Sequence, residues 1–106
     1  MKSGAVYYND LLAGYLEKHG SEDYVFQYED AYFLDPEARP ISLTFPKNQQ
    51  IYRSTKLFAF FSGLLSEGIN KRIQCRLLKI DENDDFTRLI KTAGGDTIGA
   101  ITIKEI

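Results

Sequence analysis

The sequence holds little of what catalytic and metal sites are built from. Among its 106 residues there is one cysteine, Cys75, and one histidine, His19, and there is no tryptophan. A single cysteine cannot form an internal disulfide, which excludes a disulfide-bonded scaffold and gives no reason to expect an oxidising compartment. One imidazole and one thiol are also few groups from which to build a zinc site or the active site of a cysteine-nucleophile enzyme. We therefore expect no cofactor, no metal and no enzymatic activity.

Long hydrophobic runs are absent as well. The longest uncharged apolar run, residues 57–65, is far shorter than the roughly 18 residues that a membrane-spanning helix needs. The first residues lead directly into a tyrosine-rich segment without a signal-peptide core. These features predict a cytoplasmic protein with no membrane contact.

Length and composition fit one globular domain over residues 1–106. The net charge is −2, which is not typical of a nucleic-acid-binding protein. The charges are unevenly placed, with seven acids and one lysine in residues 17–37, and seven bases and one glutamate in residues 40–80. Folding either pairs these blocks on the surface or leaves a basic face open to an acidic partner. Within the basic block, Arg72, Arg76 and Lys79 recur on one side of a predicted helix, either as a solvated edge or as phosphate contacts.

The first half of the chain indicates antiparallel sheet. Asn9-Asp10 suits a tight hairpin turn between strands at residues 6–8 and 11–16. Residues 24–28 are aromatic and β-branched enough for a third strand, and residues 29–34 suit one helical turn. Apolar and polar residues alternate strictly over 41–45, between Pro40 and Pro46, which predicts a fourth strand. Residues 47–54 are polar and predict an exposed loop.

Helical periodicity dominates the second half. We expect a helix over residues 57–65 capped by Thr55, a second over 69–79, and a third over 86–93, capped by Asp84 or Asp85 and ended by Gly94-Gly95. A β-branched last strand follows over residues 97–103. Together these elements predict an α+β fold: a curved, mostly antiparallel sheet of about five strands, forming an incomplete barrel, with three short helices.

Two motifs resemble ligand sites but fail on spacing. If Asp81 is position 1 of an EF-hand loop, Phe86 stands where glycine is required and Thr92 where glutamate is required, so helix capping explains the acids of residues 81–85 better than calcium does. Residues 94–99 are glycine-rich, yet no Gly-Lys-Ser/Thr follows them. A helix-to-strand turn is therefore favoured over a phosphate loop.

The segment from residue 57 to residue 69 is harder to bury. On a helix, one apolar stripe can face the core, formed by Leu57, Phe61, Leu64 and Leu65. Phe58 and Phe60 would then point away from that stripe. These two aromatics are either enclosed within the domain or docked on a second protein.

Several segments, in this order, resemble the small N-terminal subdomain of HipA-type serine/threonine kinases, the toxins of bacterial toxin–antitoxin systems. The matching segments are residues 6–16 (VYYNDLLAGYL), 40–46 (PISLTFP), 60–68 (FFSGLLSEG), 84–86 (DDF) and 94–100 (GGDTIGA). In the one-chain kinases a catalytic portion follows this subdomain, and these 106 residues do not contain it. The resemblance therefore implies the α+β fold given above and a protein that is not itself the kinase.

Within these kinase-related proteins the chain resembles the HipS family, the stand-alone antitoxins of three-component HipBST systems. The resemblance implies a HipT-like serine/threonine kinase as partner, which the chain would inhibit by obstructing its active site. It also implies a HipB-like helix-turn-helix DNA-binding protein, reached through the kinase, and no direct contact with nucleic acid. The implied contact residues are Phe60, Leu64, Leu65, Ser66, Glu67, Gly68, Ile69 and Arg72.

Two positions depart from the family pattern. Ser66 stands where proline is usual, and Ile69 where a bulky aromatic is usual. Ser66 is either a capping serine or a phosphoacceptor. Three other functions also remain open: an accessory subunit that orients or regulates the kinase without neutralising it, a nucleic-acid-binding module that uses the basic block, and a small hydrolase, against which the scarcity of histidine and cysteine argues.

Overall fold

The computed structural model describes residues 2–65, 69–81, 83–92 and 100–106, without the side chains of residues 69, 70 and 74. This part of the chain forms five strands and four helices. In chain order they are β1 (Lys2–Tyr8), β2 (Leu11–Gly20), β3 (Asp23–Tyr28), α1 (Asp30–Leu34), β4 (Ile51–Ser54), α2 (Ala59–Ser62), α3 (Ile69–Leu78), α4 (Asp85–Thr92) and β5 (Ile101–Glu105).

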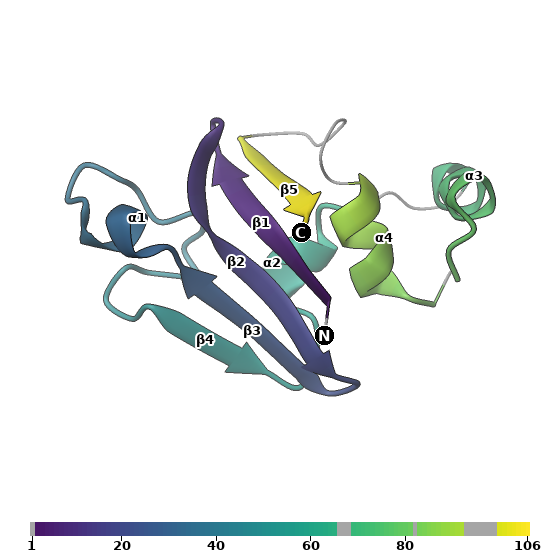
Figure 1. Ribbon diagram of the computed structural model, residues 1–106, viewed down its shortest axis with the longest axis horizontal. Helices are drawn as coiled ribbons and strands as arrows, with labels where there is room; N and C mark the ends of the chain where they lie inside the picture. The colour runs from purple at the N-terminus through teal and green to yellow at the C-terminus, as the bar shows by residue number, and fades with distance from the viewer. Residues whose placement is uncertain (1, 66–68, 82, 93–99) are drawn as a thin grey trace.

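The strands form one curved sheet in the order β4-β3-β2-β1-β5, and each described pairing is antiparallel (Figure 1). The central hairpin turns at Asn9 and Asp10, whose φ angles of 49° and 68° are ones that these residue types tolerate. Within the described residues the edge strands β4 and β5 do not pair, so the sheet is open. The predicted α+β fold with an antiparallel five-stranded sheet is confirmed, and the helical turn expected at residues 29–34 is α1.

Gly14 on β2 leaves no space for a side chain. A Cβ atom at this position would lie 2.4 Å from the carbonyl oxygen of Gln27 on β3, and backbone cannot move aside as a side-chain end can. Glycine is therefore required here for steric reasons.

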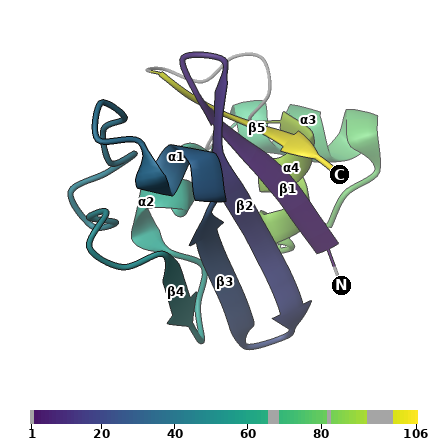
Figure 2. The same cartoon turned by 60° about the vertical axis from the view of Figure 1, so that its left-hand side comes forward.

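Helix α4 packs on β1 and β5 and also contacts α2 (Figure 2). Asp84 caps α4, because its carboxylate accepts hydrogen bonds from the Thr87 backbone N–H at 3.1 Å and from the Thr87 hydroxyl at 2.8 Å. The predicted capping by this acidic segment is confirmed. The core between sheet and helices is built from fully buried side chains, among them Val6, Leu16, Phe26, Tyr28, Phe61, Phe86, Leu89 and Ile103.

Helix α3 lies beyond α4, away from the sheet, and α1 lies at the opposite end of the 42 Å long axis (Figure 1). The predicted helix from residue 69 is confirmed. It ends where Lys79 adopts a φ of 56° and the Ile80 N–H donates to the Cys75 carbonyl oxygen at 2.9 Å, a Schellman closure. In the described ranges no helix is long and apolar enough to cross a membrane.

The strand predicted over residues 41–45 is wrong. Ile41 and Phe45 are buried but Leu43 is 100% exposed, because the Phe45 N–H donates to the Ser42 carbonyl oxygen at 3.1 Å and closes a turn. The Tyr28 hydroxyl forms hydrogen bonds with backbone groups that a neighbouring strand would otherwise satisfy. It donates to the Phe45 carbonyl oxygen and accepts from the Ile41 N–H.

The exposed loop predicted over residues 47–54 is wrong at its end, where β4 forms the edge of the sheet. Phe26 of β3 pairs with Tyr52, and Val25 with Arg53. Tyr52 is half-buried and its ring lies 5.1 Å from that of Phe45, so the aromatic core favours this strand.

The helix predicted from residue 57 is shorter than expected. It begins at Ala59, after Phe58 in extended conformation, and Thr55 does not cap it. The predicted end of the third helix at Gly94-Gly95, the glycine-rich residues 94–99 and the start of the last strand lie outside the described residues.

Candidate partner-binding site

The predicted contact segment begins on α2 and continues to α3. The structure describes the side chains of four of its eight residues, namely Phe60, Leu64, Leu65 and Arg72. The remaining predictions, Ser66, Glu67, Gly68 and the side chain of Ile69, lie outside the described residues.

Phe45 is the centre of the packing under this segment. Its ring centroid lies 5.2 Å from that of Phe58, 6.1 Å from that of Phe60 and 5.6 Å from that of Phe61. Of the two alternatives for Phe58 and Phe60, enclosure within the domain is met in part, because both rings contact this core residue. Because α2 begins only at Ala59, the extended backbone at Phe58 turns that ring onto Phe45, and both aromatics are half-buried against the core.

A hollow of about 200 Å³ lies between α2 and β4. Its lining includes the rings of Phe45, Tyr52, Phe58 and Phe60. The Tyr52 hydroxyl donates to the Pro46 carbonyl oxygen, and burial raises the pKa of this phenol. An aromatic hollow of this size can accept one apolar side chain of another protein.

The turn after α2 holds two leucines at the surface. The Leu64 N–H donates to the Phe61 carbonyl oxygen at 3.1 Å, and the Leu65 N–H donates to the Ser62 carbonyl oxygen at 3.2 Å. Both leucines rest against the core and stay partly exposed. Together with Phe60 they form what we call the α2 elbow (Phe60, Leu64, Leu65), which is apolar and accessible to a partner.

Helix α3 adds residues that the sequence interpretation missed. Ile73 is 49% exposed and Leu77 is 74% exposed, and Arg72 lies beside them on the exposed surface. The spacing of Ile69, Ile73, Leu77 and Ile80 had indicated a helix with an apolar side. That spacing could have identified these residues as contacts only if the position of α3 relative to the sheet had been known.

The two charged blocks of the sequence pair very little. Among the ion pairs of the described residues, one joins the blocks, between Arg53 and Asp23 at 3.6 Å. In the same part of the chain, none involves Arg72, Arg76 or Lys79, and all three side chains are exposed. The folded chain thus keeps a basic surface on and just after α3.

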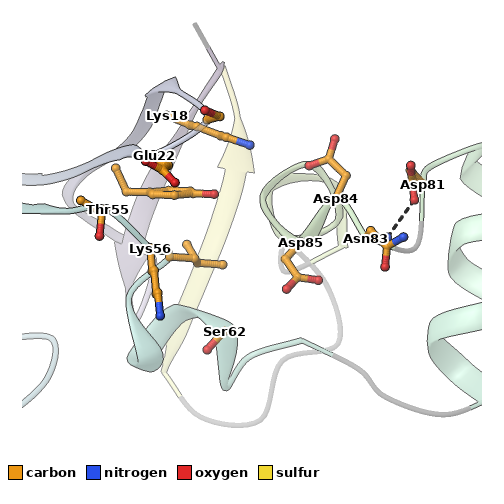
Figure 3. Close-up of a pocket in the computed structure, with 12 residues that line it drawn as sticks. Lys18, Glu22, Thr55, Lys56, Ser62, Asp81, Asn83, Asp84 and Asp85 are labelled. Atoms are coloured by element: carbon orange, nitrogen blue, oxygen red, sulfur yellow. Dashed lines mark hydrogen bonds between the residues drawn. The ribbon is translucent and has the colours of Figure 1, made fainter.

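A second, polar cleft of about 610 Å³ lies between the sheet and the start of α4. Figure 3 shows Lys18 and Lys56 on one side and Asp81, Asp84 and Asp85 on the other. Two of these carboxylates serve the local backbone, since Asp84 caps α4 and Asp81 accepts from the Asn83 N–H at 2.9 Å. Among the described residues no group of acids, histidine and cysteine is arranged to hold a metal ion.

The environment of Asp84 agrees with this capping role. Partial burial raises its pKa, but hydrogen bonds from the Thr87 side chain and backbone, together with the Lys2 ammonium, outweigh burial and lower the pKa below its ordinary value. The carboxylate is therefore held ionised at the start of α4, where the helix dipole also favours negative charge.

The two residues that could form a nucleophile–base pair, Cys75 and His19, have different surroundings. His19 contacts the Glu17 carboxylate at 2.9 Å, and Cys75 is buried on α3. The hollow that Cys75 lines, with Arg72, Arg76 and Ile80, does not include His19.

Comparison with known proteins gives a consistent relationship. Residues 4–104 match the HipA N-terminal domain family. A Haemophilus influenzae protein without an assigned function is 32% identical over 106 residues, which cover 99% of this chain and 93% of that protein. The proposed kinase Y4mE of Sinorhizobium fredii is 26% identical over 98 residues, which cover 92% of this chain and 23% of that protein.

The fold agrees with the sequence matches. The solved N-terminal domain of the HipA toxin has a TM-score of 0.74 to this structure and 29% sequence identity, over 100% of this chain and 93% of that one. The matched region is the N-terminal domain of such toxins and not their catalytic part. Since the family match spans nearly the whole sequence, the chain belongs to the HipA N-terminal domain family.

Proposed function

We propose that this chain is the antitoxin of a three-component toxin–antitoxin system, and that it binds a HipT-like serine/threonine kinase and inhibits it by obstructing the active site. One observation carries the proposal: the same domain matches 93% of a small relative and 23% of a proposed kinase. A domain found both within a kinase polypeptide and as nearly all of a small protein is suited to bind a kinase as a separate chain. That the chain inhibits the kinase is inferred from its resemblance to the HipS family.

The α2 elbow supports a protein partner at this end of the molecule. Phe60, Leu64 and Leu65 are apolar and partly exposed, and they pack on the buried core, where the Phe60 ring contacts Phe45 and Phe61. Interfaces are commonly centred on such anchors, surrounded by polar residues. A HipB-like DNA-binding protein would join the assembly through the kinase rather than through this chain.

Co-expression tests the proposal directly. A HipT-like kinase from the same genome should arrest growth when expressed alone, and this chain should restore growth and copurify with the kinase. In a purified assay the chain should lower kinase activity in proportion to the fraction of kinase bound. Copurification with undiminished kinase activity would instead establish the accessory subunit.

Two substitutions test the predicted contact segment. Leu65→Asp and Ile69→Asp should each weaken copurification and rescue of growth. Leu34→Asp is the control, because Leu34 is 76% exposed on α1, at the end of the molecule opposite α3 (Figure 1). Circular dichroism must show that each variant is folded, since Leu65 also rests on the core. If both folded variants bind and rescue like the control, the interface lies elsewhere.

The basic surface on α3 favours one other candidate, a nucleic-acid-binding module. In that case the chain alone should bind duplex DNA or RNA with an affinity that falls steeply as salt rises. Arg72→Glu combined with Arg76→Glu should then abolish binding. The acidic net charge of the chain, −2, argues against this function.

A further inference from the structure

We propose that the outward side of α3 is a second contact with the kinase, distinct from the α2 elbow, and that it fits an apolar groove with an acidic rim on the kinase's catalytic part. We call this surface the α3 outer face (Arg72, Ile73, Arg76, Leu77). The inference rests on the proposed function, since it assumes a kinase partner. It adds a second surface and the chemistry of the groove that receives it.

The α3 outer face points away from the side of α3 that the domain covers. Cys75 is 4% exposed, whereas Ile73 is 49% and Leu77 is 74% exposed. Residues two apart on an α-helix lie about 200° apart around its axis, so Cys75 and Ile73 are on nearly opposite sides. Ile73 and Leu77 are four residues apart and form one continuous stripe.

Cations border this stripe, and α3 contains no acidic residue. Arg72 and Arg76 follow each other at the same spacing of four, directly beside Ile73 and Leu77, and Lys79 comes just after the helix. None of the three takes part in an ion pair within the described residues. An acidic rim would therefore find these charges available.

A hollow beside the stripe indicates which side chains the partner would place there. It has a volume of about 330 Å³ and is lined by Arg72 and Arg76 together with Cys75 and Ile80. Two arginines in the lining of one hollow suit the side chain of an aspartate or glutamate. The occupant should thus bring carboxylates to this side of the stripe and apolar side chains to Ile73 and Leu77.

The observations favour the kinase over other occupants. A ten-residue helix is marginal by itself and is stabilised mainly by packing of its apolar residues, of which the domain covers Cys75 but leaves Ile73 and Leu77 exposed. α3 also begins within the predicted contact segment, so one partner can cover both surfaces. A nucleic acid would use the arginines but not the exposed leucine. The net charge of −2 also disfavours an anionic membrane as the occupant.

The test measures binding of the full chain to the HipT-like kinase encoded in the same genome, at low and high ionic strength. Leu77→Asp should weaken binding about 10- to 100-fold, the cost of exchanging one buried leucine for a charge. Leu34→Asp, a leucine of equal exposure on α1, should bind like the unmodified chain. Arg72→Glu combined with Arg76→Glu should weaken binding and reduce its dependence on salt, whereas Arg39→Glu should change neither.

The outcomes separate this inference from the proposed function. Unchanged affinity of folded Leu77→Asp, with the unmodified chain binding the kinase, overturns the α3 contact and leaves the proposed function intact. Binding that depends on Leu77 without loss of kinase activity supports the contact and overturns the inhibitory function. No binding by the unmodified chain overturns both. An effect of Leu77→Asp confined to self-association, or to binding of duplex DNA, also overturns the contact.

Discussion

Helices α3 and α4 have similar sequence patterns and opposite surroundings. Both are short, and both carry apolar residues at helical spacing. On α4 the apolar residues Phe86, Leu89 and Ile90 are buried against the sheet, whereas on α3 Ile73 and Leu77 face outward. Periodicity therefore identifies a helix with an apolar side, but it does not say whether the same chain or another one covers that side.

The largest expected effect is in the buried helix. Leu89→Ala removes a side chain with no exposure, and we expect the free energy of unfolding to fall by about 2–5 kcal/mol from lost burial and the cavity left behind. Urea unfolding followed by circular dichroism measures this loss. A loss below about 1 kcal/mol would show that α4 is no more firmly packed than α3.

The next largest loss of stability is expected when a buried hydroxyl group is removed from the core. Tyr28→Phe leaves the Ile41 N–H and the Phe45 carbonyl oxygen without their partner, and it should cost about 1–3 kcal/mol in the free energy of unfolding. Urea unfolding at neutral pH measures this cost. An unchanged midpoint would show that water or another group replaces the hydroxyl.

Tyr28 also predicts how stability depends on alkaline pH. Burial raises the pKa of this phenol from 10.0 to about 12. Between these pH values the unfolded chain releases the proton while the native chain keeps it, so stability, fully present below pH 10, falls as pH rises towards 12. The Tyr28→Phe protein lacks this phenol, so its stability should fall less over the same pH range. Identical alkaline profiles for the two proteins would contradict the assignment.

A smaller effect is expected at the start of α4. Asp84→Ala removes the cap and should lower the free energy of unfolding by about 1 kcal/mol at neutral pH. Because the folded pKa of Asp84 lies below its ordinary value, the stabilisation is present above the ordinary pKa and is lost as pH falls through the folded one. The difference between the two proteins should thus shrink in acid. Unfolding curves at neutral and acid pH test both points.

The smallest effect on stability is expected on α3. Leu77→Asp replaces an exposed side chain, and the free energy of unfolding should stay within about 0.5 kcal/mol of its original value. Thermal and urea unfolding of the isolated chain measure it. A marked loss of stability would mean that the domain itself covers this stripe, and the contrast between α3 and α4 would disappear.

The hairpin and the capped helix were predictable because local residue chemistry decides them. Asn9 and Asp10 tolerate positive φ, and Asp84 offers a carboxylate to the first N–H groups of α4. The strand at residues 41–45 was not predictable in the same way. Alternation there is compatible with a strand, but the Tyr28 hydroxyl satisfies the backbone groups of a turn. Tyr28 is distant in sequence, so no local pattern shows this contact.

The candidate site was predictable only in part. The apolar character of Phe60, Leu64 and Leu65 is visible in the sequence, and so is the run of cations from residue 71 to residue 79. The positions of these side chains in the folded chain are not visible in the sequence. Phe58 and Phe60 pack on Phe45, and α2 starts later than its periodicity suggests. The stripe of α3 faces outward, whereas α4 packs on the sheet.

By itself, the sequence determined where most strands and helices lie and that no disulfide can form within the chain, since these depend on residue type and short-range spacing. Tertiary structure decided which apolar surfaces are enclosed and which remain open to a partner. The physical reason is that burial depends on contacts between residues far apart in the chain: α4 packs on β1 and β5, whereas Ile73 and Leu77 of α3 stay exposed.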